Sequence, residues 1–302
     1  MSVVSPGSSS SLRIAILGGG RIGSAFAFHM ARKTEHEVTI VARPNSARLA
    51  QLQRDGGVIT TKGERGPAII SERLDESIPY DLVLVTVKDY QVKALLPTLK
   101  RSAARKIQFM FMTFDPDRLQ QAVSPERAAL GMPFLQSDFD TNGRFRTVVG
   151  KRETLTDDPH WAQIFRTAGL PARHEPQMAL WLRCHVPLGV AFESVAVAAE
   201  KRGKGAPWSR ARTLAIGIRA CFAMIRGQGY DIYPKDKARL EKLPVFAVAG
   251  MLWGLSRVSS FRTLLATGET ECCALVDDML ASATTLGQSV DPDAVSAMKS
   301  TS

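Results

Sequence analysis

Three glycines near the start of the chain have the spacing that holds a pyrophosphate. Gly18, Gly20 and Gly23 fit the pattern G-x-G-x-x-G within the segment GGGRIG. The first glycine permits a tight turn, the second lets the backbone approach the pyrophosphate, and the third lets a helix pack closely on a strand. The start of that helix offers free N–H groups and a partial positive charge to the phosphates. We therefore predict a dinucleotide site that comprises Gly18, Gly19, Gly20, Arg21, Ile22 and Gly23.

The end of the second expected strand selects between the two common dinucleotides. Proteins that bind NAD usually place an acid there for the ribose 2′-hydroxyl. This chain reads VARPNS over residues 41–46 and has Arg43 in place of an acid. A guanidinium pairs well with a 2′-phosphate, which favours NADP(H), and Arg48 could assist from the following helix. The alternative is that Arg43 is only a solvated loop residue.

The elements that must position these residues alternate between strands and helices. Residues 12–17 (LRIAIL) have the composition of a buried strand, residues 21–33 have helical spacing, and residues 37–42 (EVTIVA) form a second strand. Residues 81–87 (DLVLVTV) predict a central strand, and residues 91–100 a helix. This alternation is typical of an α/β fold with a Rossmann-type, doubly wound sheet and right-handed crossovers.

The second part of the chain has helical spacing throughout. Glycine and proline break it into four expected helices, at residues 177–201, 208–228, 235–257 and 268–286. We therefore predict a disordered tail, a Rossmann NADP-binding domain and an all-helical domain for substrate binding or dimerisation, at residues 1–11, 12–176 and 177–302.

Composition narrows the classes of partner and compartment. The chain has 302 residues, 45% hydrophobic residues and a net charge of +10. Basic residues are spread along the chain without a recognised nucleic-acid motif, so a nucleic-acid-binding module rests on charge alone. The longest apolar run, residues 243–255, is too short to span a bilayer and predicts a buried core helix. Four cysteines without a metal-ligand pattern, and no visible targeting segment, predict a cytoplasmic protein with no metal and no membrane partner.

The N-terminal motifs resemble those of the ketopantoate reductase family. The resemblance rests on the glycine turn, on Arg43 with Pro44, and on LVTVKDYQ at residues 84–91. Members of that family reduce 2-dehydropantoate with NADPH and join a Rossmann domain to a helical domain. The resemblance implies that Lys88 lies near the nicotinamide end of a cleft between the two domains and contributes to cofactor binding.

The C-terminal marks of the family are mixed. ALWLR at residues 179–183 is similar to the family's Leu-Trp-x-Lys segment, but Arg183 stands where the family has its general-acid lysine. An arginine keeps its proton at neutral pH, so Arg183 is expected to bind or orient substrate rather than protonate it. Glu271 resembles the family's substrate-binding carboxylate, with Glu269 as the alternative one register step away. Ser259 lies at about the distance of the substrate-binding serine.

The chain departs from the family again at Pro187 and Ala191, which stand where the family has asparagines. Two hypotheses follow from these departures. The first is an NADPH-dependent oxidoreductase that acts on the carbonyl of a small 2-oxo acid, such as 2-dehydropantoate, or on a related imine. Lys88, Arg183 and Glu271 would then act in catalysis. The second is a sensor or partner subunit that binds NADP(H) without turnover. Homodimerisation is left open.

Overall fold

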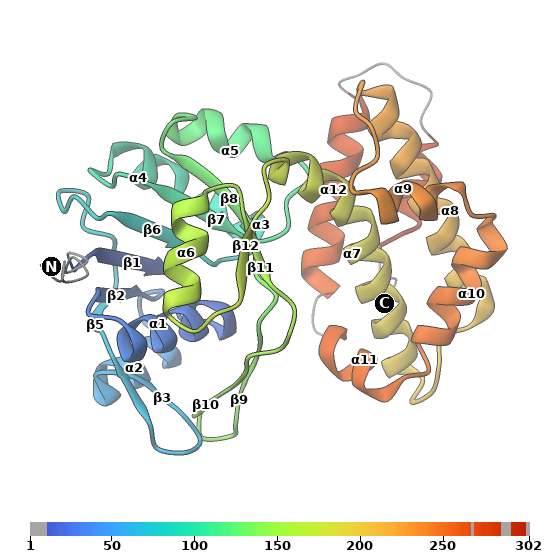
Figure 1. Cartoon of the computed structure of the whole chain (residues 1–302). Coiled ribbons are helices and arrows are strands. Elements are labelled where there is room, and N and C mark those ends of the chain that lie inside the picture. Colours follow the sequence, from blue (N-terminus) through green and yellow to red (C-terminus); the bar gives the residue numbers. More distant parts are fainter. Residues whose placement is uncertain (1–10, 267–268, 285–290, 300–302) are drawn as a thin grey trace, which may run out of the picture. The chain divides into compact units, whose positions relative to one another are not determined.

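The computed structural model describes residues 11–266, 269–284 and 291–299 (Figure 1). Nearly all of the predicted tail therefore lies outside the described residues. The chain forms two compact units. The first comprises Met1–Val87, Ala94–Phe111 and Gln120–Pro176, and the second comprises Lys88–Lys93, Met112–Leu119 and Gln177–Ser302. The assignment of a separate function to each part of the chain stays a prediction.

An eight-stranded sheet organises the first unit, in the order β12-β11-β8-β7-β6-β1-β2-β5. From β5 to β8 the strands run parallel, and β11 pairs antiparallel with β8. This order confirms the doubly wound α/β prediction, because the chain steps outward from β1 first to one edge and then to the other. The strands are β1 Arg13–Leu17, β2 Glu37–Val41, β5 Ile69–Ser71, β6 Leu82–Val85, β7 Ile107–Met110, β8 Ala128–Met132, β11 Thr154–Thr156 and β12 Ala172–His174.

Helices pack on this sheet through large apolar side chains. Phe26 of α1 and Phe165 of α6 meet with ring centroids 5.1 Å apart. Ile14 and Ile16 of β1 are fully buried, as a central strand requires. The helices that begin in this unit are α1 Arg21–Lys33, α2 Ala47–Asp55, α4 Leu96–Arg101 and α6 Pro159–Thr167.

Sequence reasoning missed two small antiparallel pairs in this unit. The hairpin of β9 (Gln136–Phe139) and β10 (Phe145–Val148) turns at residues 140–144. A shorter pair joins β3 (Gly57–Ile59) to β4 (Arg65–Pro67).

The helix predicted at residues 91–100 is wrong in its continuity. The structure has α3 at Asp89–Val92 and α4 at Leu96–Arg101. Pro97 lies in the first turn of α4, where its missing N–H costs no hydrogen bond. Helix α5 (Pro116–Val123) follows β7.

The second unit is built around α7 (Met178–Lys201), which packs against α8, α11 and α12. The other helices are α8 Trp208–Gly227, α9 Lys235–Lys242, α10 Val245–Leu255, α11 Ser259–Leu265, α12 Glu269–Thr284 and α13 Pro292–Ser296.

The single helix predicted at residues 235–257 is also wrong. It is two helices, because Pro244 is the N-cap of α10 and ends the preceding segment. The expected buried core helix is buried on one face only. Val248, Ala249 and Leu252 are buried, whereas Phe246 is 69% exposed.

Among the described helices, α7 alone is both long and apolar enough to cross a bilayer. Of its most apolar stretch, 78% is buried inside the structure. Such burial is what the core helix of a folded unit requires.

Candidate functional site

The glycine turn begins where β1 ends and has no room for side chains at two positions. Gly18 has φ +115°, a conformation that favours glycine, and its N–H donates to the carbonyl of Val41 at 2.9 Å. A Cβ on Gly23 would lie 1.9 Å from the carbonyl oxygen of Gly18. These two glycines therefore let α1 start directly against the turn.

Gly20 fits the remaining requirement of a diphosphate site. It is the N-cap of α1, it makes no side-chain cap, and the first turn of the helix carries no acid. A Cβ added at Gly20 would meet nothing within 4 Å, so open space lies beside its backbone. The helix start thus presents N–H groups and positive dipole charge to a space that a phosphate can enter. The residues present fit the diphosphate of a dinucleotide.

This turn lies at the switch point of the sheet, where β1 is flanked by β2 and β6. Ligands of doubly wound sheets bind at the carboxyl ends of strands at such a point. Thr86 follows β6 there, and its hydroxyl lies 3.0 Å from the carbonyl oxygen of Leu17 and 3.2 Å from that of Gly18. Sequence reasoning gave Thr86 no role, although a hydroxyl next to the strand beside β1 was a readable signal.

Arg43 follows β2, and its side chain is exposed. The Ser46 hydroxyl donates to the Arg43 carbonyl at 2.7 Å and accepts from the N–H of Leu49, which caps α2. The backbone of Arg43 is therefore held by the start of α2. Among the described residues, no acidic side chain forms an ion pair with Arg43, so its guanidinium is available for an anion.

Lys88 and Glu271 lie together in the second unit. Lys88 is the N-cap of α3, and its Nζ is 3.1 Å from Oε2 of Glu271 on α12. Burial by itself would lower the pKa of Lys88, but the charge of Glu271 and its hydrogen bond outweigh burial and raise that pKa. Lys88 therefore keeps its positive charge at neutral pH and holds it beside a carboxylate.

A partly buried acid, Glu193, adjoins this pair. Oε2 of Glu193, on α7, accepts a hydrogen bond from the Cys272 thiol at 3.0 Å. Burial, and after it the charge of Glu271, raises the pKa of Glu193 to about 7. Glu193 thus retains its proton close to neutral pH, a property that sequence reasoning did not predict.

The segment that carries Lys88 is fixed to the helical unit by a second ionic group. Asp89 is 2% exposed and forms an ion pair with Arg118 of α5. Arg118 also lies 3.8 Å from a carboxylate oxygen of Asp278 on α12. This group accounts for the clustering of α3 with the second unit.

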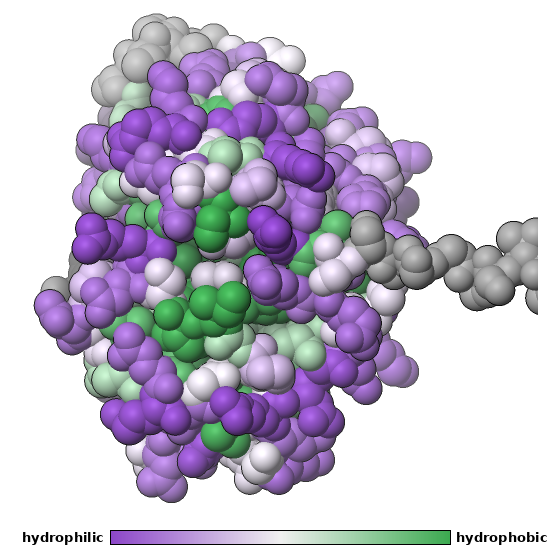
Figure 2. All heavy atoms as spheres, turned by 90° about the vertical axis from the view of Figure 1, so that its left-hand side faces the viewer, coloured by the Kyte–Doolittle hydropathy of each residue, from purple (hydrophilic) through white to green (hydrophobic). Residues whose placement is uncertain are grey.

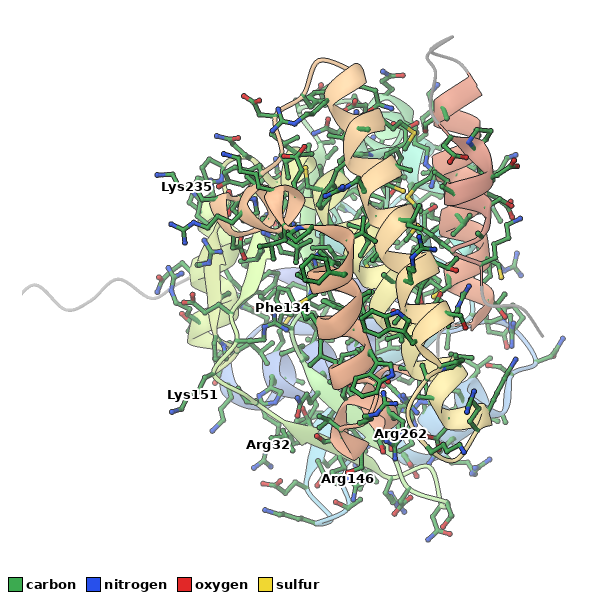
Figure 3. All side chains as sticks on the ribbon, turned by 90° about the vertical axis from the view of Figure 1, so that its right-hand side faces the viewer. Arg32, Phe134, Arg146, Lys151, Lys235 and Arg262 are labelled. Carbon is green, nitrogen blue, oxygen red and sulfur yellow. The ribbon has the colours of Figure 1, made fainter. Side chains whose placement is uncertain are left out.

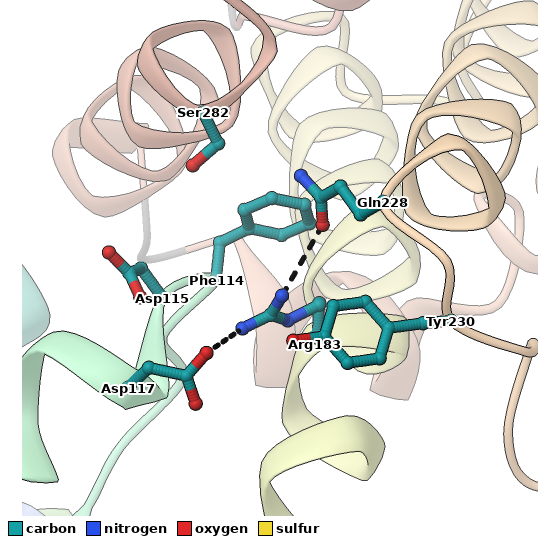
Figure 4. A pocket seen from close by; sticks show the side chains of 7 residues that line it. All are labelled: Phe114, Asp115, Asp117, Arg183, Gln228, Tyr230 and Ser282. Carbon is teal, nitrogen blue, oxygen red and sulfur yellow. Dashed lines mark hydrogen bonds and ion pairs between the residues drawn. The ribbon is translucent and has the colours of Figure 1, made fainter. Parts of the chain in front are cut away.

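Arg183 lines a polar pocket of about 230 Å³ within the second unit (Figure 4). It is 8% exposed, and its guanidinium donates to Asp117 at 2.8 Å and to Gln228 at 3.3 Å. The same group lies over the ring of Tyr230, 4.4 Å from the centroid. Phe114, Asp115 and Ser282 complete the lining. The positive charge of Arg183 is therefore balanced inside the protein.

The residues predicted to face the substrate fall into different places. Lys88 lines another pocket of the second unit, of about 440 Å³, together with Thr270. Neither Arg183 nor Ser259 lines that pocket, and Ser259 begins α11 as an exposed residue. The side chain of Glu269 lies outside the described residues. No group of three or more potential metal ligands occurs in the part of the chain that the structure describes.

Fold and turn together define a Rossmann-type α/β unit with the geometry of a dinucleotide site, joined to a helical second unit. Residues 14–155 match the family model of the ketopantoate reductases, described as "Ketopantoate reductase PanE/ApbA". This match covers the part of the chain that carries the glycine turn, and it agrees with the resemblance that the N-terminal motifs indicated.

One known protein is similar to part of this chain. A 2-dehydropantoate 2-reductase of Bacillus subtilis (strain 168) is 30% identical over 99 residues, which is 33% of this chain. That match spans about a third of the relative's own length, 32%.

Solved structures share the fold over almost the whole chain. A PanE/ApbA family ketopantoate reductase from Ralstonia eutropha JMP134 has a TM-score of 0.72 and 19% identity, with 95% of this chain and 96% of that chain covered. D-mandelate dehydrogenase in complex with NADH has a TM-score of 0.70 and 12% identity, with 95% and 96% covered. At these identities the likeness concerns the fold.

Proposed function

We propose that the chain is an NADPH-dependent oxidoreductase that reduces the carbonyl of a small 2-oxo acid, such as 2-dehydropantoate, or a related imine. The observation that carries this proposal is the glycine turn at the switch point, with the exposed Arg43 at the end of the neighbouring strand. The match of residues 14–155 to the ketopantoate reductase model supports it.

The chain's own residues divide the task of binding. The turn from Gly18 to Gly23 would hold the diphosphate through backbone N–H groups, and Arg43 would pair with the 2′-phosphate. The bound dinucleotide would supply the hydride.

Lys88 and Glu271 would serve the substrate. Reduction of a carbonyl develops negative charge on oxygen, which the Lys88 ammonium would stabilise. Because its pKa is raised, Lys88 would act first by charge and only slowly as a proton donor. Glu271 would hold the ammonium in place and accept a hydrogen bond from a substrate hydroxyl. Arg183 and Ser259, which were expected to contact the substrate, do not line the pocket of Lys88, so we assign neither a contact with a substrate held there.

A specific observation favours the second candidate, an NADP(H)-binding protein without turnover. Arg183 occupies the position of the family's general acid, and its guanidinium is already engaged by Asp117, Gln228 and Tyr230. An engaged arginine neither donates a proton nor offers free charge to a carboxylate.

One pair of measurements distinguishes the two candidates. NADPH fluorescence is titrated with the protein, and absorbance at 340 nm is then followed with a panel of 2-oxo acids that includes 2-dehydropantoate, and with cyclic imines. Binding followed by oxidation of NADPH supports the reductase. Binding without oxidation by any compound supports the second candidate, and no binding of NADPH contradicts both.

A further inference from the structure

One peptide of the glycine turn is held from one side by two donors. The carbonyl of Gly19 accepts from Nε of Arg48 at 2.9 Å and from the hydroxyl of Ser24 at 3.1 Å. The C=O of Gly19 and the N–H of Gly20 belong to one planar trans peptide and point in opposite directions. Fixing the carbonyl therefore fixes the direction of the Gly20 N–H.

Arg48 is itself held on every side. One terminal nitrogen donates to Oγ of Ser24 at 2.9 Å, and the other donates to Gln51 at 3.0 Å and to the carbonyl of Gly143 at 3.3 Å. Its guanidinium lies over the ring of Phe139, 4.3 Å from the centroid. Burial lowers the pKa of Arg48 to about 10, so the group remains charged at neutral pH. An arginine with all three nitrogens engaged is a fixed part of the site wall.

The partners of Arg48 come from a hairpin that is distant in sequence. Gly143 and Phe139 belong to the β9–β10 hairpin and its turn, which Gln51 also binds by donating to the carbonyl of Asn142 at 3.1 Å. Arg21, at the start of α1, forms an ion pair of 2.9 Å with Asp138 of the same hairpin. The hairpin, α2 and the glycine turn thus form one connected wall within the first unit.

We infer that Arg48 is a positioning residue for the diphosphate: it holds the Gly19–Gly20 peptide so that the Gly20 N–H faces the phosphates, and it does not bind the 2′-phosphate. This inference rests on the proposed function, since it concerns how the same dinucleotide is held. Arg43 and Arg48 then have separable tasks, although both are arginines close to the turn.

Two fragments of the dinucleotide separate these tasks. ADP carries the diphosphate without the 2′-phosphate, and 2′-AMP carries the 2′-phosphate without the diphosphate. Both are titrated by calorimetry against the wild type and against Arg48→Met, Arg48→Lys, Ser24→Ala and Arg43→Ala. Arg54→Ala is the matched control, because Arg54 is an exposed arginine of the same helix α2.

Arg48→Met is expected to weaken the binding of ADP about tenfold, which corresponds to the loss of one charged hydrogen bond. The Kd of 2′-AMP should stay within about twofold of the wild-type value. Arg43→Ala is expected to do the reverse. Ser24→Ala should weaken the binding of ADP by a smaller factor, and Arg48→Lys should restore part of the ADP affinity lost in Arg48→Met. Arg54→Ala should change the affinity for neither ligand. The affinities for NADPH and NADH should fall by the same factor in Arg48→Met.

The inference is overturned if Arg48→Met weakens 2′-AMP as Arg43→Ala does, because Arg48 would then bind the 2′-phosphate itself. It is also overturned if Arg48→Met binds ADP as tightly as the wild type. A wild type that binds neither NADPH, NADH nor ADP contradicts the proposed function instead.

A measurement without any ligand guards against misfolding as the cause. Amide hydrogen exchange of the cofactor-free protein should become faster in Arg48→Met at Gly18 and Ser24, whose N–H groups donate to the carbonyls of Val41 and Gly20, with exchange in β7 and β8 unchanged. Faster exchange throughout the sheet would contradict a local role for Arg48. Unchanged exchange in the turn would contradict the inference that Arg48 holds the Gly19–Gly20 peptide.

Discussion

Two arginines near the glycine turn illustrate how context decides the task of a side chain. Arg43 is exposed, whereas Arg48 is partly buried and donates to four hydrogen-bond acceptors beside an aromatic ring. An exposed guanidinium retains its donors for a ligand. A guanidinium whose donors are engaged by protein acceptors instead makes the surrounding turn rigid.

Replacing Arg43 by glutamate should reverse the preference for the dinucleotide. The carboxylate would repel the 2′-phosphate and accept from the ribose 2′-hydroxyl of NADH. NADPH affinity is expected to fall about 10- to 100-fold, as for loss of a charged hydrogen bond with added repulsion. Fluorescence titrations of NADPH and NADH measure the change, with Arg54→Glu as the control. An unchanged NADPH to NADH ratio in Arg43→Glu would contradict the assignment of Arg43.

Removing the charge of Lys88 should impair turnover without impairing cofactor binding. Loss of one stabilising group of the developing oxyanion is expected to lower kcat/KM about 100-fold in Lys88→Met. The NADPH Kd should stay within about threefold. Lys93→Met is the control, because Lys93 is an exposed lysine of the same segment. Equal losses in both variants would remove Lys88 from the catalytic group.

Glu271→Gln tests the same pair through pH. Glu271 raises the pKa of Lys88, so its neutralisation should lower that pKa. The basic limb of kcat/KM against pH should then move to lower pH. A basic limb at the wild-type position would show that Lys88 does not carry the titrating proton.

At the scale of elements, α7 and α12 hold an acid that costs stability when it ionises. The Glu193 carboxyl has a pKa of about 7 in the folded protein, against 4.5 as its ordinary value. Between these two values the folded state binds the proton that the unfolded chain has released. The contribution of this group to stability is therefore present below pH 4.5 and lost as pH rises to about 7.

Glu193→Gln should remove this loss while it preserves an acceptor for Cys272. The variant is expected to melt at the wild-type temperature near pH 4.5 and roughly 4 °C higher near pH 8. Asp157 and Asp278 have pKa values raised by burial to about 6 and about 7, so the comparison is between variants at each pH. Glu72→Gln, at an exposed position, is the control. A constant difference at all pH values would contradict ionisation of Glu193 as the cause.

Proline shows which element boundaries the sequence could have predicted. Pro244 ends one helix and caps the next, and Pro97 lies in the first turn of α4. Both breaks were readable, because a proline cannot continue a helix from the preceding turn. Pro187, by contrast, lies inside α7. Local rules alone do not separate these cases, since packing around a long helix can offset the lost hydrogen bond.

At the scale of the whole molecule, the basic residues behind the net charge of +10 are dispersed. Basic side chains belong to many elements, among them Lys235 of α9 and Arg262 of α11 (Figure 3). Hydrophilic side chains surround a smaller hydrophobic area on the face drawn in Figure 2. A dispersed charge favours anionic small molecules in pockets over one continuous polyanion track.

Binding of NADPH should stabilise the chain and protect the first unit in particular. At one hundred times its Kd, a ligand that binds only the folded state adds about 2.7 kcal/mol to the free energy of unfolding. Slowed amide exchange is expected at β1, the glycine turn and the residues after β2. Protection confined to the second unit would contradict the assignment of the dinucleotide to the glycine turn.

The sequence by itself determined the sheet class and the glycine turn, because both depend on local spacing: alternating elements, and glycines where side chains cannot fit. It also carried the motifs by which residues 14–155 match the ketopantoate reductase model. Only the tertiary structure decided that Lys88 meets Glu271 and that Asp117 and Gln228 engage Arg183. It also decided that Arg48 bonds both to Gly19 and to Gly143, which lies 95 residues after Arg48 in the chain. The reason is physical: burial and partnership are set by segments far apart in the chain, and these decide which charges are available to a ligand.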